Sequence, residues 1–557
     1  GLHLDQASSL LVLSGVTLDN VSTTSASLGL RVDNASSIEF LEVLDSTPLL
    51  ISEGVSLTGG IELMQGGTLQ LTGPGTVQST LKLYGGTLDI DDNLSWSGVW
   101  SQEADGVIDI AVGNTLLYED GNLDLGVHAL EIKGAGSFDF TDNQSAIVLD
   151  QSSSLLELSD NGTVSHVRIQ ATPSSGRGLQ ITGQPTLGSL ELLVDTSLSV
   201  ANQFSVEQGI LVDGVTLTLN DNGIFTSSLV LDNGTLQISG QPTFSGTLSQ
   251  TSPSRVRLNP GSLLTTEKAL GLGHGVLQLE GPGTLANGQT FVLDQAGAGL
   301  EFSDNVSVSG AVELGAGAFR ASGDATLSGS LSLLTDAQIE VGANQTLSYS
   351  GSSLNVGANK LGLSGGGSLS NTQPVILDQA SSLLSFEGIS QTGPVQVNVA
   401  SDSGYGLEVK ATVVVSKIEA LAETSLVLSV NQSLSGDVLL SSGSGLTVSG
   451  NGLLASSVEL AGGALRIPDN RILSNDLSLT SDSLLEITGE LLLEQSGGLG
   501  VGANVLSLSG GGRLNIAGGL HLDQASSLLV LSGVTLDNVS TTSASLGLRV
   551  DNASSIE

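Results

Sequence analysis

The sequence contains no cysteine and few aromatic residues, and each shortage limits what the chain can be. Without cysteine it cannot form a disulfide framework. Aromatic residues make up 3% of the chain and hydrophobic residues 39%, so a core can form but must be aliphatic. We therefore expect a core of Leu, Val, Ile and Ala.

Basic residues are also scarce. The chain has 16 Lys and Arg against 56 Asp and Glu, a formal charge of −40. Nucleic-acid binding requires clustered Lys and Arg, so this charge balance argues against a nucleic-acid partner. It argues equally against an anionic membrane surface. A uniformly acidic surface instead keeps long particles apart and attracts cations.

Long apolar runs and a leader sequence are missing as well. No apolar run approaches the ~20 residues that a membrane-spanning helix needs. The chain starts inside a repeat at Gly1, without a charged n-region or an apolar h-region. We expect any export signal to lie outside these residues.

Short alternating runs separated by glycine turns fill the chain instead. Apolar runs of strand length occur at Leu10–Leu13, Leu69–Leu71, Leu81–Leu83 and Leu88–Ile90. Turn formers such as Gly73-Pro74-Gly75 lie between them. Helix signals are weak because Gly, Ser, Thr, Val and Asn dominate. The pattern predicts an all-β protein.

The strongest single observation is an internal identity. Residues 519–557 repeat residues 1–39 without a difference, at an offset of 519 − 1 = 518 residues. Chance does not produce an identity of this length. We interpret the chain as one 518-residue period and the start of the next, taken from a longer tandem array.

A shorter repeat lies inside the period. The motif Leu-Asp-Gln occurs with its aspartate at Asp5, Asp150, Asp294, Asp378 and Asp523. The intervals are 145, 144, 84 and 145 residues and together span the period. They define super-repeats of about 5–149, 150–293, 294–377 and 378–522. We expect the first four aspartates to occupy equivalent corners of the fold.

Two further motifs keep the same spacing. One begins with Leu125-Gly126, Leu272-Gly273, Val356-Gly357 or Val501-Gly502 and ends in a glycine-containing turn nine to twelve residues later. A Gly-Gly-Thr-Leu type of turn recurs with its apolar residue at Leu88, Leu236, Phe319 and Leu465. Three independent anchors agree, so the super-repeat is real.

The short interval indicates the architecture. It lacks about 61 residues relative to its neighbours, roughly three turns of a β-solenoid at about 20 residues each. A solenoid can lose whole turns and keep every strand stacked, whereas a partial turn would move later side chains to the wrong face. We predict one continuous right-handed parallel β-helix over residues 1–557, with about 20 residues per coil.

The strand repeats resemble those of a known group of proteins. The pattern Leu-x-Leu-x-Gly-x-Gly-Thr, at Leu69–Val77 and Leu277–Leu285, resembles the repeats of bacterial autotransporter passengers and filamentous-haemagglutinin-like adhesins. The resemblance covers the whole chain in style and carries no site residues. It implies export and display at the cell surface.

Candidate chemical groups have simpler structural explanations. The histidines His3, His128, His166, His274 and His521 are several coils apart, and His128 and His274 take turn positions that Asn359 and Asn504 hold in other repeats. A metal or catalytic site would need clustered partners. The sequence predicts no catalytic, cofactor-binding or metal-binding residue.

Aspartates raise the question of calcium. Calcium-binding β-rolls need tandem Gly-Gly-x-Gly-x-Asp nonapeptides, which do not occur here. We expect the following Asp-Asn pairs to form turns, with only loose Ca²⁺ association at the acidic surface: Asp33-Asn34, Asp92-Asn93, Asp160-Asn161, Asp232-Asn233 and Asp304-Asn305. A strand would put Trp96 and Trp100, the only tryptophans, on one face with Leu94, and either core packing or a lateral contact explains them.

These observations predict a non-enzymatic structural filament, extracellular or at the cell surface, that associates with copies of itself. One alternative is the stalk of a giant adhesin whose binding tip lies outside these residues. Another is a carbohydrate-active β-helix, which would need paired carboxylates or carboxylate–Arg groups in a groove, usually with aromatic platforms. Because residues 1–39 and 519–557 are identical, we expect covalent continuity between periods rather than separate chains meeting end to end.

Overall fold

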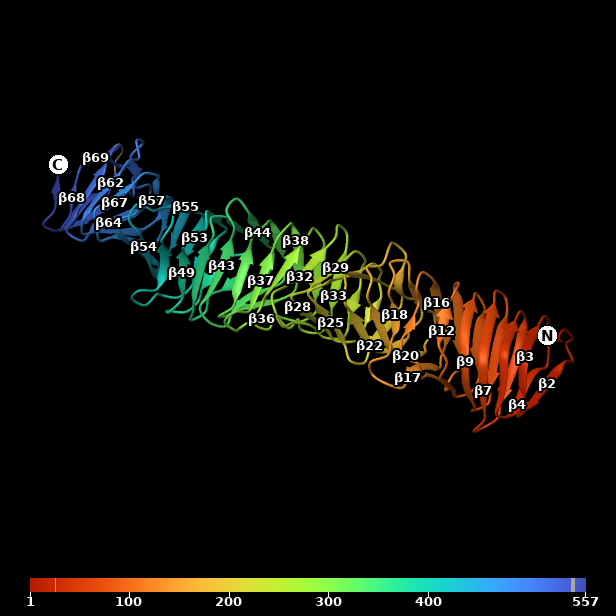
Figure 1. Ribbon diagram of the computed structural model, residues 1–557. Helices are drawn as coiled ribbons and strands as arrows, with labels where there is room; N and C mark the ends of the chain where they lie inside the picture. The colour runs from red at the N-terminus through yellow and green to blue at the C-terminus, as the bar shows by residue number, and fades with distance from the viewer. Residues whose placement is uncertain (26, 542–545) are drawn as a thin grey trace. The chain divides into compact units, whose positions relative to one another are not determined.

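The structure is a computed structural model that describes residues 1–25, 27–541 and 546–557. The described residues are all-β, with strands from β1 (Leu2–Leu4) to β71 (Ser555–Ile556) and no helix. They form two compact units, Gly1–Gly273 with Gly283–Gln289, and His274–Pro282 with Thr290–Glu557. Within each unit, successive turns of the chain stack as parallel strands (Figure 1). The predicted all-β solenoid class is confirmed; its handedness and continuity stay predictions.

The first unit shows how the sequence spacing becomes stacking. One side of its first coils consists of β2 (Leu10–Ser14), β4 (Gly29–Asn34), β6 (Ser46–Ile51) and β8 (Thr68–Thr72). These strands pair in parallel, so that Leu11, Leu30, Leu49 and Leu71 lie in one column. Turns about 20 residues apart thus place like side chains above one another, as predicted.

The opposite side of the same coils consists of longer strands. They are β3 (Thr17–Thr23), β5 (Ser36–Val43), β7 (Ser56–Met64) and β9 (Thr76–Tyr84), again paired in parallel. In β9 the side chains of Val77, Ser79, Leu81 and Leu83 are buried, whereas Gln78, Thr80 and Lys82 face solvent. This two-residue alternation gives each strand one core face.

The second unit repeats the scheme. Its strands β56 (Gly445–Gly450), β58 (Ala464–Ile467) and β61 (Ser483–Ile487) place Leu446, Leu465 and Leu485 in another buried column. Because each coil pairs with the coils on both sides, backbone N–H and C=O groups are satisfied along the stack.

The few aromatic residues gather inside the aliphatic core. The rings of Trp96 and Trp100 meet edge to face at 5.0 Å, and Tyr118 and Phe138 extend the cluster. Burial raises the pKa of Tyr118 to about 12. Core packing of both tryptophans is confirmed, although they belong to two strands, β11 (Leu94–Trp96) and β12 (Trp100–Gln102).

One predicted turn is wrong. Asp33 and Asn34 complete strand β4 instead of forming a turn. Arg31 pairs with Asp33 at 3.1 Å, and Asn34 donates a hydrogen bond to Ser14 of the neighbouring coil at 2.7 Å. These two contacts stabilise the extended backbone, so the strand continues through both residues.

The other Asp-Asn pairs lie at bends or turns or adjoin a strand end. Asn233, Asp304 and Asn305 adopt positive φ, with values of 52°, 56° and 64°. Asn and Asp tolerate this left-handed conformation because their short polar side chains hydrogen-bond locally.

Candidate functional site

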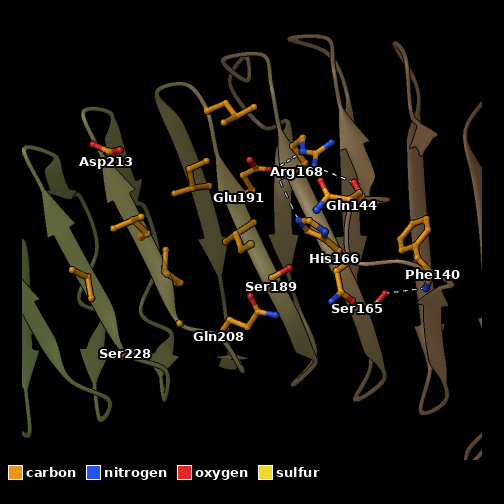
Figure 2. A pocket seen from close by; sticks show the side chains of 18 of the residues that line it. Phe140, Gln144, Ser165, His166, Arg168, Ser189, Glu191, Gln208, Asp213 and Ser228 are labelled. Atoms are coloured by element: carbon orange, nitrogen blue, oxygen red, sulfur yellow. Dashed lines mark hydrogen bonds and ion pairs between the residues drawn. The ribbon is translucent and has the colours of Figure 1, made fainter. Parts of the chain in front are cut away.

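A polar groove of about 740 Å³ lies on the outside of the solenoid in the first unit. It crosses β20 (Thr163–Ile169), β22 (Thr186–Leu192), β25 (Ile210–Asp213) and β28 (Leu229–Asp232), and the loop after β17 (Ser137–Phe140) borders it. Figure 2 shows polar side chains from successive strands lining one surface.

The groove lies where the coil turns a corner within single strands. In β20 the regular alternation is interrupted, because Ser165 and His166 are both partly exposed in succession. On the next coil the corner is Gly188, where a Cβ atom would lie 2.4 Å from the Ser165 carbonyl oxygen. Only glycine permits this close approach of the two coils, and Ser189, which follows it, lines the groove.

Three charged or titratable side chains form the centre of the groove. Arg168 pairs with Glu191 on the adjacent strand and donates a second hydrogen bond to the Gln144 carbonyl oxygen at 3.2 Å. The His166 ring lies 4.0 Å from the same Glu191 carboxylate (Figure 2). Arg168 therefore links three consecutive coils.

Burial and the nearby Arg168 charge lower the pKa of His166, and Glu191 only partly offsets them. The imidazole is consequently neutral at pH 7 and presents one hydrogen-bond donor and one acceptor. A neutral ring suits hydrogen bonding to an uncharged ligand better than binding of an anion.

The loop at the edge of the groove is held by its own carboxylate. The backbone N–H groups of Gln144 and Ser145 donate to Asp142 Oδ1 at 2.9 and 2.7 Å, and these bonds lower the pKa of Asp142. The Ser165 hydroxyl accepts a hydrogen bond from the Phe140 N–H at 3.2 Å. These groups shape a polar surface that can hydrogen-bond a ligand.

A second arrangement explains why the sequence motifs recur. The Leu-Asp-Gln motif continues as Asp-Gln-x-x-Ser in four of its five copies. In three of these, the Asp and Ser side chains both contact a glycine one coil earlier. Asp150 Oδ1 accepts a hydrogen bond from the Gly126 N–H at 3.0 Å, while the Ser154 hydroxyl donates to the Gly126 carbonyl. We name this arrangement the corner clamp.

The corner clamp has the same form in the second unit. Asp378 and Ser382 form hydrogen bonds to the backbone of Gly357, and Asp523 and Ser527 form them to the backbone of Gly502. The gripped glycines adopt positive φ near 60°, a conformation that glycine adopts without strain. Each clamp thereby satisfies a donor and an acceptor at a corner that strand pairing leaves out.

The sequence shows both the Leu-Asp-Gln motif and the apolar-Gly motif, but it does not show directly that the two are in contact. The clamp aspartates follow their glycines by 24, 21 and 21 residues, close to one coil, and this offset was the available signal. The four predicted aspartates share one local setting. Each directly follows a strand, and the carbonyl of the next residue, Gln, accepts a hydrogen bond from the N–H three residues further on: Asp5, Asp150, Asp294 and Asp378. Their equivalence on the coil cross-section stays a prediction. The super-repeat boundaries themselves stay predictions.

The histidines are dispersed, as expected. The His128 N–H donates to the Leu125 carbonyl at 3.3 Å within a turn. Asn359, at the matching position, bonds the Val356 carbonyl at 3.3 Å through its side chain. Within the described ranges, no three or more His, Asp or Glu side chains are placed to hold a metal ion.

None of the helices that a membrane crossing would require occurs in the described part of the chain. Comparison with protein-family models, with curated proteins and with solved structures finds no match. The chain therefore has to be interpreted from its own repeats and geometry.

Proposed function

We propose that this chain is a segment of a structural extracellular filament built from tandem 518-residue solenoid periods. One observation carries the proposal: the second copy of the period start continues the stack as an ordinary coil. Strands β66 (Leu520–Leu522) and β67 (Leu528–Ser532) lie 518 residues after β1 and β2 and pair in parallel with the strands before them.

The internal architecture supports a mechanical role. Each coil contacts only its neighbours, so a solenoid grows in length without a new fold. The aliphatic columns and the parallel backbone pairing repeat in both units. Length and stiffness then follow from the number of coils, with no catalytic residue and no cofactor required.

The surface charge supports an extended extracellular particle. With a net charge of −40, neighbouring filaments repel one another at low salt. Cations, including Ca²⁺, would associate loosely with the exposed carboxylates and reduce this repulsion. Extracellular or cell-surface placement rests on the resemblance of the repeats to autotransporter passengers and filamentous-haemagglutinin-like adhesins.

The groove around His166 supports a second candidate, the stalk of an adhesin with binding capacity along its side. Its neutral imidazole, amides and hydroxyls favour an uncharged polar ligand. This role is compatible with a filament, because the groove lies on the outer surface of a coil.

Denaturing electrophoresis of the native material tests the proposed filament. Material too large to enter the gel is the expected result, because tandem periods would be covalently joined. A band near the 56.2 kDa mass of the present chain would overturn the tandem arrangement. Electron micrographs of the same material would show whether long unbranched fibres are present.

A further inference from the structure

The boundary between one period and the next contains an ion pair whose arginine stands where the other super-repeats have an uncharged residue. We name residues 498–541 the period seam, because Gly519 begins the second copy within them. Arg513 Nε and Nη2 donate to the two carboxylate oxygens of Asp537 at 3.1 and 2.9 Å. Nη2 also reaches Glu557 at 2.9 Å, one coil further. Arg513 therefore connects three consecutive coils across the seam.

The position of Arg513 within its motif makes this contact specific. The matching residues of the other three super-repeats are small and uncharged: Ser137, Thr284 and Ser368. The partner position differs in the same way. Strand pairing aligns Arg513 with Thr535 and Ser137 with Thr163, so Asp537 corresponds to Ser165. In the third super-repeat, Ser368 aligns with Gln391 and the partner position is Gly393. Of these three aligned pairs, only the one at the seam is ionic.

By identity, the partners of Arg513 also exist at the start of the chain. Asp537 and Glu557 are the copies of Asp19 and Glu39. Asp537 is 9% exposed, whereas Asp19 faces solvent. The same carboxylate is therefore buried where residues 498–518 cover it.

The apolar residues around this aspartate show the same change in solvent exposure between the two copies. Three of them are open to solvent in the first copy and covered in the second. Their exposed fractions fall from 40% to 0% for Leu2 and Leu520, from 44% to 6% for Val12 and Val530, and from 41% to 2% for Val16 and Val534. The face of residues 2–23 thus has the shape and composition of a covered surface.

We propose that the face of residues 2–23 is a docking surface for a coil with the sequence of residues 498–518, supplied by a preceding period. Arg513 is its specificity residue. The corner clamp does not by itself distinguish one coil from another. Its glycine can come from Leu125-Gly126, from Val356-Gly357 or from Val501-Gly502. Arg513 restricts the choice, because only the last coil of a period places a cation against Asp19 and Glu39. This proposal rests on the tandem filament and names the contact that joins its periods.

The charge balance adds to the selectivity. In a chain with few basic residues, a coil without Arg513 would leave Asp19 buried and unpaired, which is costly. A bidentate arginine–carboxylate contact is both strong and directional. Stacking of a coil without Arg513 is therefore disfavoured by the unpaired Asp19 carboxylate. Stacking of the coil with Arg513 is favoured by its two hydrogen bonds to that carboxylate.

Hydrogen exchange provides the test, because residues 2–23 and 520–541 yield identical peptides. In the present chain we expect two equal populations of this peptide, one protected and one fast. In a chain in which residues 1–518 precede residues 1–557, the peptide occurs three times, and we expect two thirds of it to be protected. Protection of only one third would overturn the docking surface.

The Arg513→Ser variant of the present chain tests the specificity residue. Serine is the residue that Ser137 and Ser368 provide in stable coils, so folding should survive. We expect exchange of the protected population to accelerate about tenfold. Arg320→Ser is the matched control, since Arg320 pairs with Glu340 on the next coil at 2.8 Å away from the seam. It should leave the peptide unchanged.

The outcomes separate this proposal from the filament. An Arg513→Ser chain with unchanged exchange would overturn the role of Arg513 whatever the native fibre looks like. Native material that migrates as a single period would overturn the filament, while the exchange result at the internal seam would still stand. Arg513→Lys should restore only part of the protection, because lysine cannot bond both oxygens of Asp537 in the same planar geometry.

Discussion

Residues 1–23 and 519–541 share every residue, yet they differ in backbone conformation. In the first copy, β3 runs unbroken from Thr17 to Thr23. In the second, the same stretch is divided into β68 (Thr535–Leu536) and β69 (Val539–Thr541) at Asn538, which has a φ of 57°. The first copy stacks on β5, an unbroken strand, whereas the second stacks on a coil that turns a corner at Ile516. The backbone of each copy thus adopts the conformation of the coil on which it stacks.

This difference separates two kinds of information in the sequence. The alternation of apolar and polar residues is the same in both copies and places Leu13 and Leu531 equally in the core. The bend at the corner is not local information, because the stacked coil decides it. Matched substitutions in the two copies therefore measure what a neighbouring coil contributes.

The largest difference in lost stability between the two copies is expected when Leu529 and its copy Leu11 are each replaced by alanine. Leu529 is fully buried, whereas its copy Leu11 is partly exposed. Leu529→Ala should cost about 3 kcal/mol of local stability, and Leu11→Ala about 1 kcal/mol, because the cavity left at Leu11 opens to water. Hydrogen exchange resolves the two, since the substituted copy has a different mass. Equal losses would mean that residues 498–518 do not support the second copy.

The clamp serine comes next. Ser527 accepts a hydrogen bond from the Gln524 N–H at 2.9 Å and donates to Gly502, and it is fully buried. Ser527→Ala should cost about 1.5 kcal/mol, because the Gly502 carbonyl loses its buried partner. Ser9→Ala, the same substitution in the first copy, should cost less than about 0.5 kcal/mol. A cost at Ser9 as large as that at Ser527 would show that the serine acts within its own turn.

Asn538 and Asn20 should respond to glycine with opposite signs. Glycine adopts positive φ without strain, so Asn538→Gly should stabilise the seam by about 0.5 kcal/mol. Asn20 lies within an extended strand, where glycine is unfavourable, so Asn20→Gly should destabilise by about 0.5–1 kcal/mol. Urea titration followed by exchange at the corner measures both. Effects of the same sign would mean that the two copies share one conformation in solution.

The smallest effect should be the same in both copies. His3 Nδ1 contacts the Ser22 hydroxyl at 2.6 Å, and His521 makes the same 2.6 Å contact with Ser540. Both contacts point to the following segment, which each copy possesses. His3→Ala and His521→Ala should each cost about 0.5 kcal/mol in the same exchange measurement. A larger cost in one copy would show that the cover provided by residues 498–518 also affects this contact.

Much of the fold was predictable because it depends on periodicity. The strands at Leu69–Leu71 and Leu88–Ile90, the 20-residue spacing and the aliphatic core all follow from alternation and turn residues. The strand end at Asp33-Asn34 was not predictable, since it depends on Ser14 in another coil. The groove was missed for the same reason: His166, Arg168 and Glu191 meet only after stacking, and neighbours in space lie 23 residues apart in the chain.

The identity of the two copies also has a genetic consequence. If the two coding stretches are identical as well, they can recombine when they misalign during replication, and each event then adds or removes the sequence between them. Here that sequence is one 518-residue period, and the strands on either side of the join are those that already pair at the seam. Arg513 lies in the coil before the join and Asp19 in the coil after it, so the product needs no compensating substitution. If the chain forms the proposed filament, we therefore expect its length to change only in steps of whole periods, while every coil within a period keeps its place.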